Sequence, residues 1–139
     1  MSAAIPDRLR SLVRERAKGH CEYCLLSEED TFLFHEPDHI LAEKHGGLTI
    51  AENMALACFY CNRFKGSDIA SLDPQTGMLV RIFNPRTQIW QEHFKLNGPR
   101  IEPITPEGRV TERILKPNQS ARIRERLELQ KRGRYPLVV

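Results

Sequence analysis

Apolar positions near the start of the chain recur at the spacing of an amphipathic helix. They are Leu9, Leu12, Val13 and Ala17. Pro6 stands where the first turn would begin and Gly19 stands just past the last turn, which are positions that these residue types favour. The pattern therefore predicts a helix over residues 6–18 that leads directly into the first pair of cysteines.

The pattern then changes to that of short strands. Residues 31–35 are β-branched and aromatic, which predicts a strand, and Pro37 limits its length before a second strand begins at residues 38–41. His39 is therefore expected on or beside a strand. A helix is expected to start at the second pair of cysteines and to end at Gly66.

The segment between the second strand and that helix contains a Gly-Gly dipeptide, which predicts a loop over residues 42–48. Thr49 and Glu52 follow at the spacing of a capping box, in which each side chain caps the other's backbone at the start of a helix. We therefore expect a short helical turn that carries Asn53.

Beyond residue 68 the chain alternates turns with short periodic segments. The expected elements are a turn at 73–77, strands at 78–83 and 89–96, a turn at Asn97-Gly98, and helices over 105–115 and from Asn118 or Ser120 to Arg132. No linker composition separates these elements from the first half. The 139 residues are therefore predicted to form a single domain, with a core at about 15–68 and a C-terminal extension at about 69–139.

Composition is that of an ordinary globular protein, with 40% hydrophobic and 28% charged residues and a net charge of +3. The distribution of charge is more informative, because residues 8–18 and 109–134 are rich in arginine and lysine. Such ends attract phosphate backbones, but a solvated helix face with i,i+4 ion pairs has the same composition. The charge alone leaves both interpretations open.

Four cysteines occur as two Cys-x-x-Cys pairs, Cys21/Cys24 and Cys58/Cys61. A two-residue gap lets one tight turn bring two sulfurs to one ion, so two such pairs predict a closed structural zinc site. The alternative is a pair of disulfides, which needs an oxidising compartment. The N-terminal segment has arginines where a signal peptide has its apolar run, and no stretch is apolar enough to span a bilayer. We therefore expect a cytoplasmic protein with reduced thiols and no membrane partner.

Between the cysteine pairs stand Asp38-His39, Gly46-Gly47 and Asn53, and Asn62 follows the last cysteine. The sequence CEYC, followed by PDHILAEKHGGLTIAENMALACFYCNRFKG, resembles the HNH endonuclease family, in particular its four-cysteine, McrA-like branch. The resemblance covers residues 21–66. It implies an α+β fold with a ββα-metal core, also described as a His-Me finger or treble clef, built on a structural zinc.

The resemblance also implies roles for the residues of the motif. His39 would be the general base that activates water, Asp38 and Asn62 would hold a divalent cation, and Asn53 would orient His39. Asn62 stands where the name-giving members have histidine. A neutral amide oxygen there favours Mg²⁺ or Mn²⁺ and weakens metal binding when no substrate is present.

The implied substrate is DNA, although the sequence does not separate DNA from RNA or a monomer from a homodimer. Lys65, Arg63 and His45 are candidates for contacts with phosphate, and each is equally understood as a surface residue. A rival interpretation is a zinc-ribbon or treble-clef module that binds nucleic acid without cutting it. That interpretation explains the cysteines but gives no reason for the spacing of Asp38, His39, Asn53 and Asn62.

Overall fold

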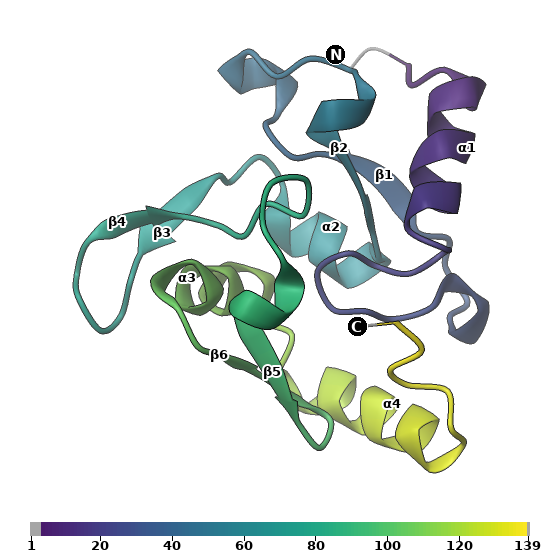
Figure 1. Ribbon diagram of the computed structural model, residues 1–139, viewed down its shortest axis with the longest axis vertical. Coiled ribbons are helices and arrows are strands. Elements are labelled where there is room, and N and C mark those ends of the chain that lie inside the picture. The colour runs from purple at the N-terminus through teal and green to yellow at the C-terminus, as the bar shows by residue number, and fades with distance from the viewer. Residues whose placement is uncertain (1–3, 139) are drawn as a thin grey trace.

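The computed structural model describes residues 4–138 (Figure 1). In chain order the elements are α1 (Asp7–Arg16), β1 (Glu36–His39), β2 (Met54–Ala57), α2 (Phe59–Lys65), β3 (Ala70–Leu72), β4 (Leu79–Arg81), β5 (Phe94–Asn97), β6 (Arg100–Pro103), α3 (Pro106–Leu115) and α4 (Ser120–Lys131). Within this described part, the strands form three separate two-stranded antiparallel sheets. The predicted α+β class is confirmed.

A ββα unit forms the centre of the N-terminal half. β1 and β2 pair antiparallel with Asp38 opposite Ala55 and His39 opposite Met54, and α2 follows β2 almost directly. In Figure 1, α1 lies beside this hairpin, where Val13 packs against buried side chains of β2. The unit places Asp38 and His39 on a strand, as predicted, but at its end: β1 stops at His39 and does not run over 38–41. Asn62 lies on the adjoining helix.

The strand predicted over residues 31–35 is absent, and β1 instead runs through Pro37. Phe32, Leu33 and Phe34 are all exposed and only His35 is buried, so alternate residues do not form a buried face that would fix this segment as a strand. Pro37 is tolerated because, within residues 4–138, β1 pairs only with β2 and its other edge needs no N–H donor.

The predicted capping box of Thr49 and Glu52 is also wrong. A 3-10 turn does form over Ala51–Asn53, but its N-cap is Ile50, without a side-chain cap bond in this described segment. The hydroxyl of Thr49 instead contacts His39. A polar side chain that can cap a helix can equally bond a distant partner, which local spacing does not reveal.

Most turns and helices of the extension lie where the sequence predicts them, but the strands have other bounds than predicted. α3 begins after Thr105, whose hydroxyl accepts from Gly108 N at 3.0 Å. The strand predicted at 89–96 is a 3-10 turn at Trp90–Glu92 followed by β5. Its partner β6 and the short strand β3 have too few alternating residues to be recognised from the sequence.

The basic C-terminal stretch is divided between surface and interior. Five of its basic side chains are exposed, namely Arg113, Lys116, Arg124, Lys131 and Arg132, whereas four arginines have partners within the fold. Arg122 and Arg126 are buried in α4, Arg109 pairs with Asp73 at 2.7 Å, and Arg134 pairs with acidic residues of the N-terminal half. These four guanidinium groups therefore hold the extension in place and are not displayed for phosphate.

Candidate functional site

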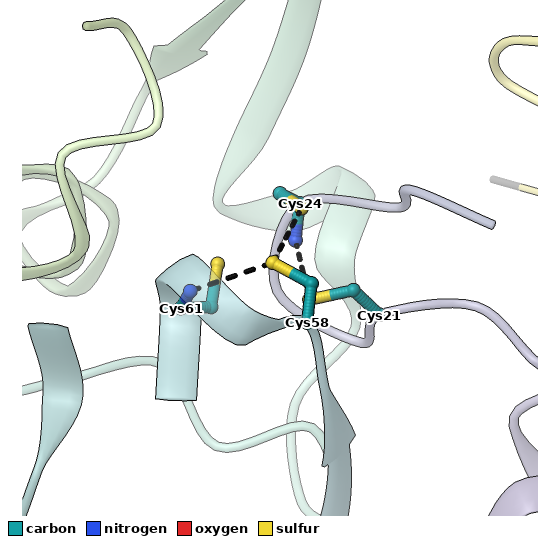
Figure 2. A group of neighbouring side chains, drawn as sticks. All are labelled: Cys21, Cys24, Cys58 and Cys61. Carbon is teal, nitrogen blue, oxygen red and sulfur yellow. Dashed lines mark hydrogen bonds between the residues drawn. The ribbon is translucent and has the colours of Figure 1, made fainter. Parts of the chain in front are cut away.

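The four cysteine sulfurs meet at one point, from the turn before β1 and from the start of α2 (Figure 2). All four lie within 4.8 Å of one another, and Cys24 Sγ is 3.7 Å from Cys58 Sγ. Tetrahedral zinc with bonds of about 2.3 Å places its sulfur ligands roughly 3.8 Å apart, whereas a disulfide needs about 2.0 Å. The donors therefore fit structural zinc, and all four thiols are free of disulfides.

Each pair of cysteines forms the same kind of turn. Cys24 N donates to Cys21 Sγ at 3.4 Å, and Cys61 N donates to Cys58 Sγ at the same distance. Backbone donors of this kind stabilise thiolates and fix their direction. Burial raises the pKa of Cys21, whereas hydrogen bonds from the neighbouring cysteines lower the pKa of Cys24.

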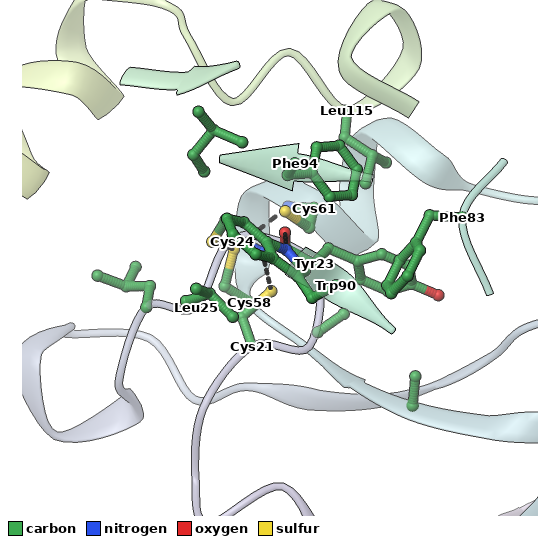
Figure 3. Packing of buried hydrophobic residues seen from close by; sticks show 14 of the residues in the cluster. Cys21, Tyr23, Cys24, Leu25, Cys58, Cys61, Phe83, Trp90, Phe94 and Leu115 are labelled. Atoms are coloured by element: carbon green, nitrogen blue, oxygen red, sulfur yellow. Dashed lines mark hydrogen bonds between the residues drawn. The ribbon is translucent and has the colours of Figure 1, made fainter. Parts of the chain in front are cut away.

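The extension packs directly on this cluster (Figure 3). Arg122 of α4 donates to Cys61 Sγ at 3.0 Å and is nearly fully buried. Tyr135 donates its hydroxyl to the carbonyl of Cys24 at 2.7 Å, and the indole of Trp90 donates to the carbonyl of Tyr23 at 2.9 Å. Burial alone would lower the pKa of Arg122, but the neighbouring sulfur charges raise it. A fixed positive charge therefore faces the thiolates.

A separate pocket is lined by residues of α1, β1, the loop after β1, and α2. It has a volume of about 440 Å³. Its walls include Asp38, His39, Asn62, Glu43, Arg10 and Lys44. The structure thus brings three residues of the predicted site to one pocket. Arg10 and Lys44 add two basic side chains, of which Arg10 lies in the basic segment 8–18 noted in the sequence.

The imidazole of His39 is held by neighbours that the motif does not include. Its Nε2 lies 2.9 Å from Thr49 Oγ1 and 3.9 Å from Glu43 Oε1, and 15% of its side chain is exposed. Because Nε2 is engaged, Nδ1 is the nitrogen left without a hydrogen bond among the described residues. Thr49 would have been hard to find from sequence, because its spacing to Glu52 points to a cap.

Asn53 holds the loop between β1 and β2, and its side-chain hydrogen bonds within the described residues go to that loop and not to the imidazole of His39. Its side chain accepts from Leu41 N and donates to Leu41 O, both at 2.9 Å, and donates to Leu48 O at 2.8 Å. Gly47 is required in the same loop, since a Cβ there would lie 1.7 Å from the carbonyl oxygen of Leu41. Asn53 therefore closes the loop that carries Glu43 and Lys44.

Asp38 is nearly buried and shares an ion pair with Lys65, whose Nζ lies 2.9 Å from Asp38 Oδ2. Burial raises the pKa of Asp38, and the ammonium of Lys65 opposes this shift. Lys65 is itself fully buried. The predicted contact between Lys65 and a substrate phosphate is therefore wrong for this structure, because the side chain points into the protein.

The other candidates for phosphate contact lie outside the walls that define the pocket. His45 is exposed, and its Nε2 lies 3.2 Å from the carbonyl of Ser67. Arg63 is exposed on α2 and rests over the ring of Phe59 at 5.8 Å from the centroid. Both stay predictions as substrate contacts, at the margin of the site.

Residues 21–68, about a third of the chain, match the family model described as HNH endonuclease. The cysteine cluster lies within this matched segment and fits a zinc-containing HNH domain. Comparisons with curated proteins and with solved structures give no significant match. No helix in residues 4–138 has the length and apolar character needed to cross a membrane.

Proposed function

We propose that this protein is a metal-dependent endonuclease that hydrolyses phosphodiester bonds of DNA, with the pocket of Asp38, His39 and Asn62 as its active site. The observation that carries the proposal is the gathering of these three side chains, from β1 and α2, on one pocket within a matched HNH domain. A module that only binds would need the zinc fold but no such pocket.

His39 is the proposed general base. A hydrogen bond from Nε2–H to Thr49 Oγ1 would leave the lone pair on Nδ1, which could then take a proton from a water molecule. Glu43, 3.9 Å from Nε2, would stabilise the imidazolium that results. Asn53 serves as a positioning residue, because its three hydrogen bonds hold the loop that presents Glu43.

Asp38 and Asn62 are the proposed ligands of a divalent cation. The donors on offer are a carboxylate and a neutral amide oxygen, which suit Mg²⁺ or Mn²⁺ better than zinc. When bound, such a cation supplies Lewis-acid stabilisation to the phosphate and to the leaving 3′-oxygen. Arg10 and Lys44 lie on the same walls and are placed to attract the phosphate backbone.

The test is a plasmid cleavage assay that compares the wild type with His39→Ala, with Mg²⁺, with Mn²⁺ and with EDTA. We expect cleavage only with added cation, and a loss of about 10²- to 10⁴-fold in the variant, the usual contribution of a general base. One zinc per chain and an unchanged melting temperature in the variant would show that the fold is intact.

The rival binding module makes a different prediction in the same experiment. Both proteins would bind DNA equally and neither would cut it, with or without cation. His45→Ala adds a graded comparison, because His45 lies outside the pocket walls and should cost far less activity than His39→Ala.

A further inference from the structure

Lys65 is a lysine in an unusual place. It ends α2, none of its side chain is exposed, and its ammonium has two partners that are consecutive in the chain. Nζ lies 2.9 Å from Asp38 Oδ2 and donates to His39 O at 2.8 Å. Burying an unpaired ammonium is strongly unfavourable, so the ammonium of Lys65 is stable in the interior because of these two contacts.

The two carboxylate oxygens of Asp38 have different surroundings. Oδ2 is buried, and its contact with Lys65 is electrostatic, without the direction of a good hydrogen bond. Asp38 nevertheless contributes to the wall of the pocket. Oδ1 is therefore the oxygen that a ligand in the pocket can reach.

We propose that Lys65 is a positioning residue for Asp38: it fixes the carboxylate so that Oδ1 alone is offered to a divalent cation, and its charge weakens cation binding until substrate arrives. The proposal rests on the function proposed above. Its physical basis is that one carboxylate charge is shared between an ammonium and a cation, while a substrate phosphate supplies the missing negative charge.

Two features argue against simpler roles. A side chain that contacts a substrate phosphate must be exposed, whereas Lys65 is paired with Asp38 and has no exposed area. A purely structural lysine would need a carboxylate partner, and any buried carboxylate would serve. The partner of Lys65 is instead Asp38, which lines the pocket beside His39. The second contact, to the carbonyl of His39, ties the same ammonium to the backbone of the proposed base.

The experiment compares Lys65→Met, which keeps the length and removes the charge, with Lys65→Arg, which keeps the charge. Lys131→Met is the matched control, because Lys131 is an exposed lysine on α4. Mn²⁺ binding without DNA is measured from the free-ion electron paramagnetic resonance signal. Cleavage is measured as a function of Mn²⁺ concentration, and zinc content and melting temperature are recorded for each protein.

We expect Lys65→Met to bind Mn²⁺ roughly tenfold more tightly than the wild type, because a like charge near the cation is gone. At saturating Mn²⁺ its cleavage rate should fall by about 10²-fold, because Asp38 is no longer held in place. Lys65→Arg should keep a Mn²⁺ affinity near that of the wild type, and Lys131→Met should match it in every measurement. A merely structural lysine would not tighten Mn²⁺ binding.

An unchanged or weaker Mn²⁺ affinity in a folded Lys65→Met protein would overturn the proposal. If this variant unfolds without cation, Mn²⁺ should restore its folding by replacing the ammonium beside Asp38, and failure to restore it would equally overturn the proposal. A wild type that neither binds Mn²⁺ nor cuts DNA would instead refute the proposed function. The two failures are therefore distinguishable.

Discussion

The zinc cluster and the polar pocket stand on the same ββα unit but differ in almost every physical respect. The cluster consists of four buried sulfurs, and residues of the extension close over it. The pocket is open, offers oxygen and nitrogen donors, and is lined mainly by residues of α1, β1, the following loop and α2. Soft ligands with no open position suit a permanent structural ion, whereas hard ligands with open positions suit an exchangeable one.

The difference also explains how the two regions are supported. Arg122, Trp90 and Tyr135 reach the cluster from positions far along the chain, so its stability depends on the extension. The pocket depends on contacts within the N-terminal half, such as those of Thr49 and Asn53 with residues 39–48 and that of Lys65 with Asp38. Changes at the cluster should therefore affect folding, and changes at the pocket should affect cleavage.

The largest effect is expected from Cys58→Ser, which removes one zinc ligand while leaving a serine that can still cap α2. Binding of structural zinc is worth on the order of 10–16 kcal/mol of folding free energy in small domains. We expect loss of zinc and of cooperative thermal unfolding, measured by metal analysis and circular dichroism. A variant that keeps a sharp transition without zinc would show that the cluster is not needed for the fold.

Arg122→Met should have the next largest effect. It removes the guanidinium that contacts Cys61 Sγ at 3.0 Å and leaves the thiolate charge without its buried partner. Loss of one member of a buried charge pair costs about 3–5 kcal/mol. Zinc release to a chromogenic chelator should become faster and the melting temperature should fall.

Arg124→Met is the matched control for that measurement, because Arg124 is exposed on the same helix. It should release zinc at the rate of the wild type. Equal release rates in all three proteins would mean that the extension does not stabilise the cluster.

Thr49→Val tests the pocket without changing the size of the side chain. It removes the contact to His39 Nε2 and should lower cleavage by about tenfold, in keeping with the 10–100-fold typical of partners that orient a catalytic histidine. Zinc content should not change, and Thr49→Ser should recover most of the activity because it restores the hydroxyl. Failure of serine to rescue would separate Thr49 from the orientation of His39.

The smallest effect concerns the phosphate backbone. Lys44 lines the pocket, whereas Arg63 rests over Phe59 outside its walls. Lys44→Ala should weaken DNA binding a few-fold and reduce the salt slope by about one unit, and Arg63→Ala should do less. Titrations at several salt concentrations compare the two variants. A larger effect at Arg63 than at Lys44 would support the prediction from sequence that Arg63 contacts phosphate.

Elements with a strong local signal were predictable, and those defined by distant partners were not. The helix at α1, the end of α2 at Gly66 and the start of α3 at Thr105 follow from caps and periodicity. The strand through Pro37 and the turn at Trp90–Glu92 depend on partners elsewhere in the chain. Local pattern does not carry that information.

The same limit applies to the candidate site. The cysteine pairs and the Asp38-His39 dipeptide have a spacing that the sequence makes visible. The burial of Lys65 and of Arg122 could not be predicted from the sequence. A lysine or arginine on a helix has the same sequence pattern whether its side chain faces water or a buried partner. The predictions that failed are therefore those for charged side chains whose partners lie far away in the sequence.

The most direct measurement follows zinc content and cleavage in one sample while the hard cation is removed and then restored. A Mg²⁺-free wild type should keep one zinc per chain, show an unchanged melting temperature and cut no DNA, and cleavage should return on adding Mg²⁺ or Mn²⁺. Cleavage that persists with zinc alone, or that is lost only when zinc leaves, would contradict a structural cluster beside a separate catalytic cation site.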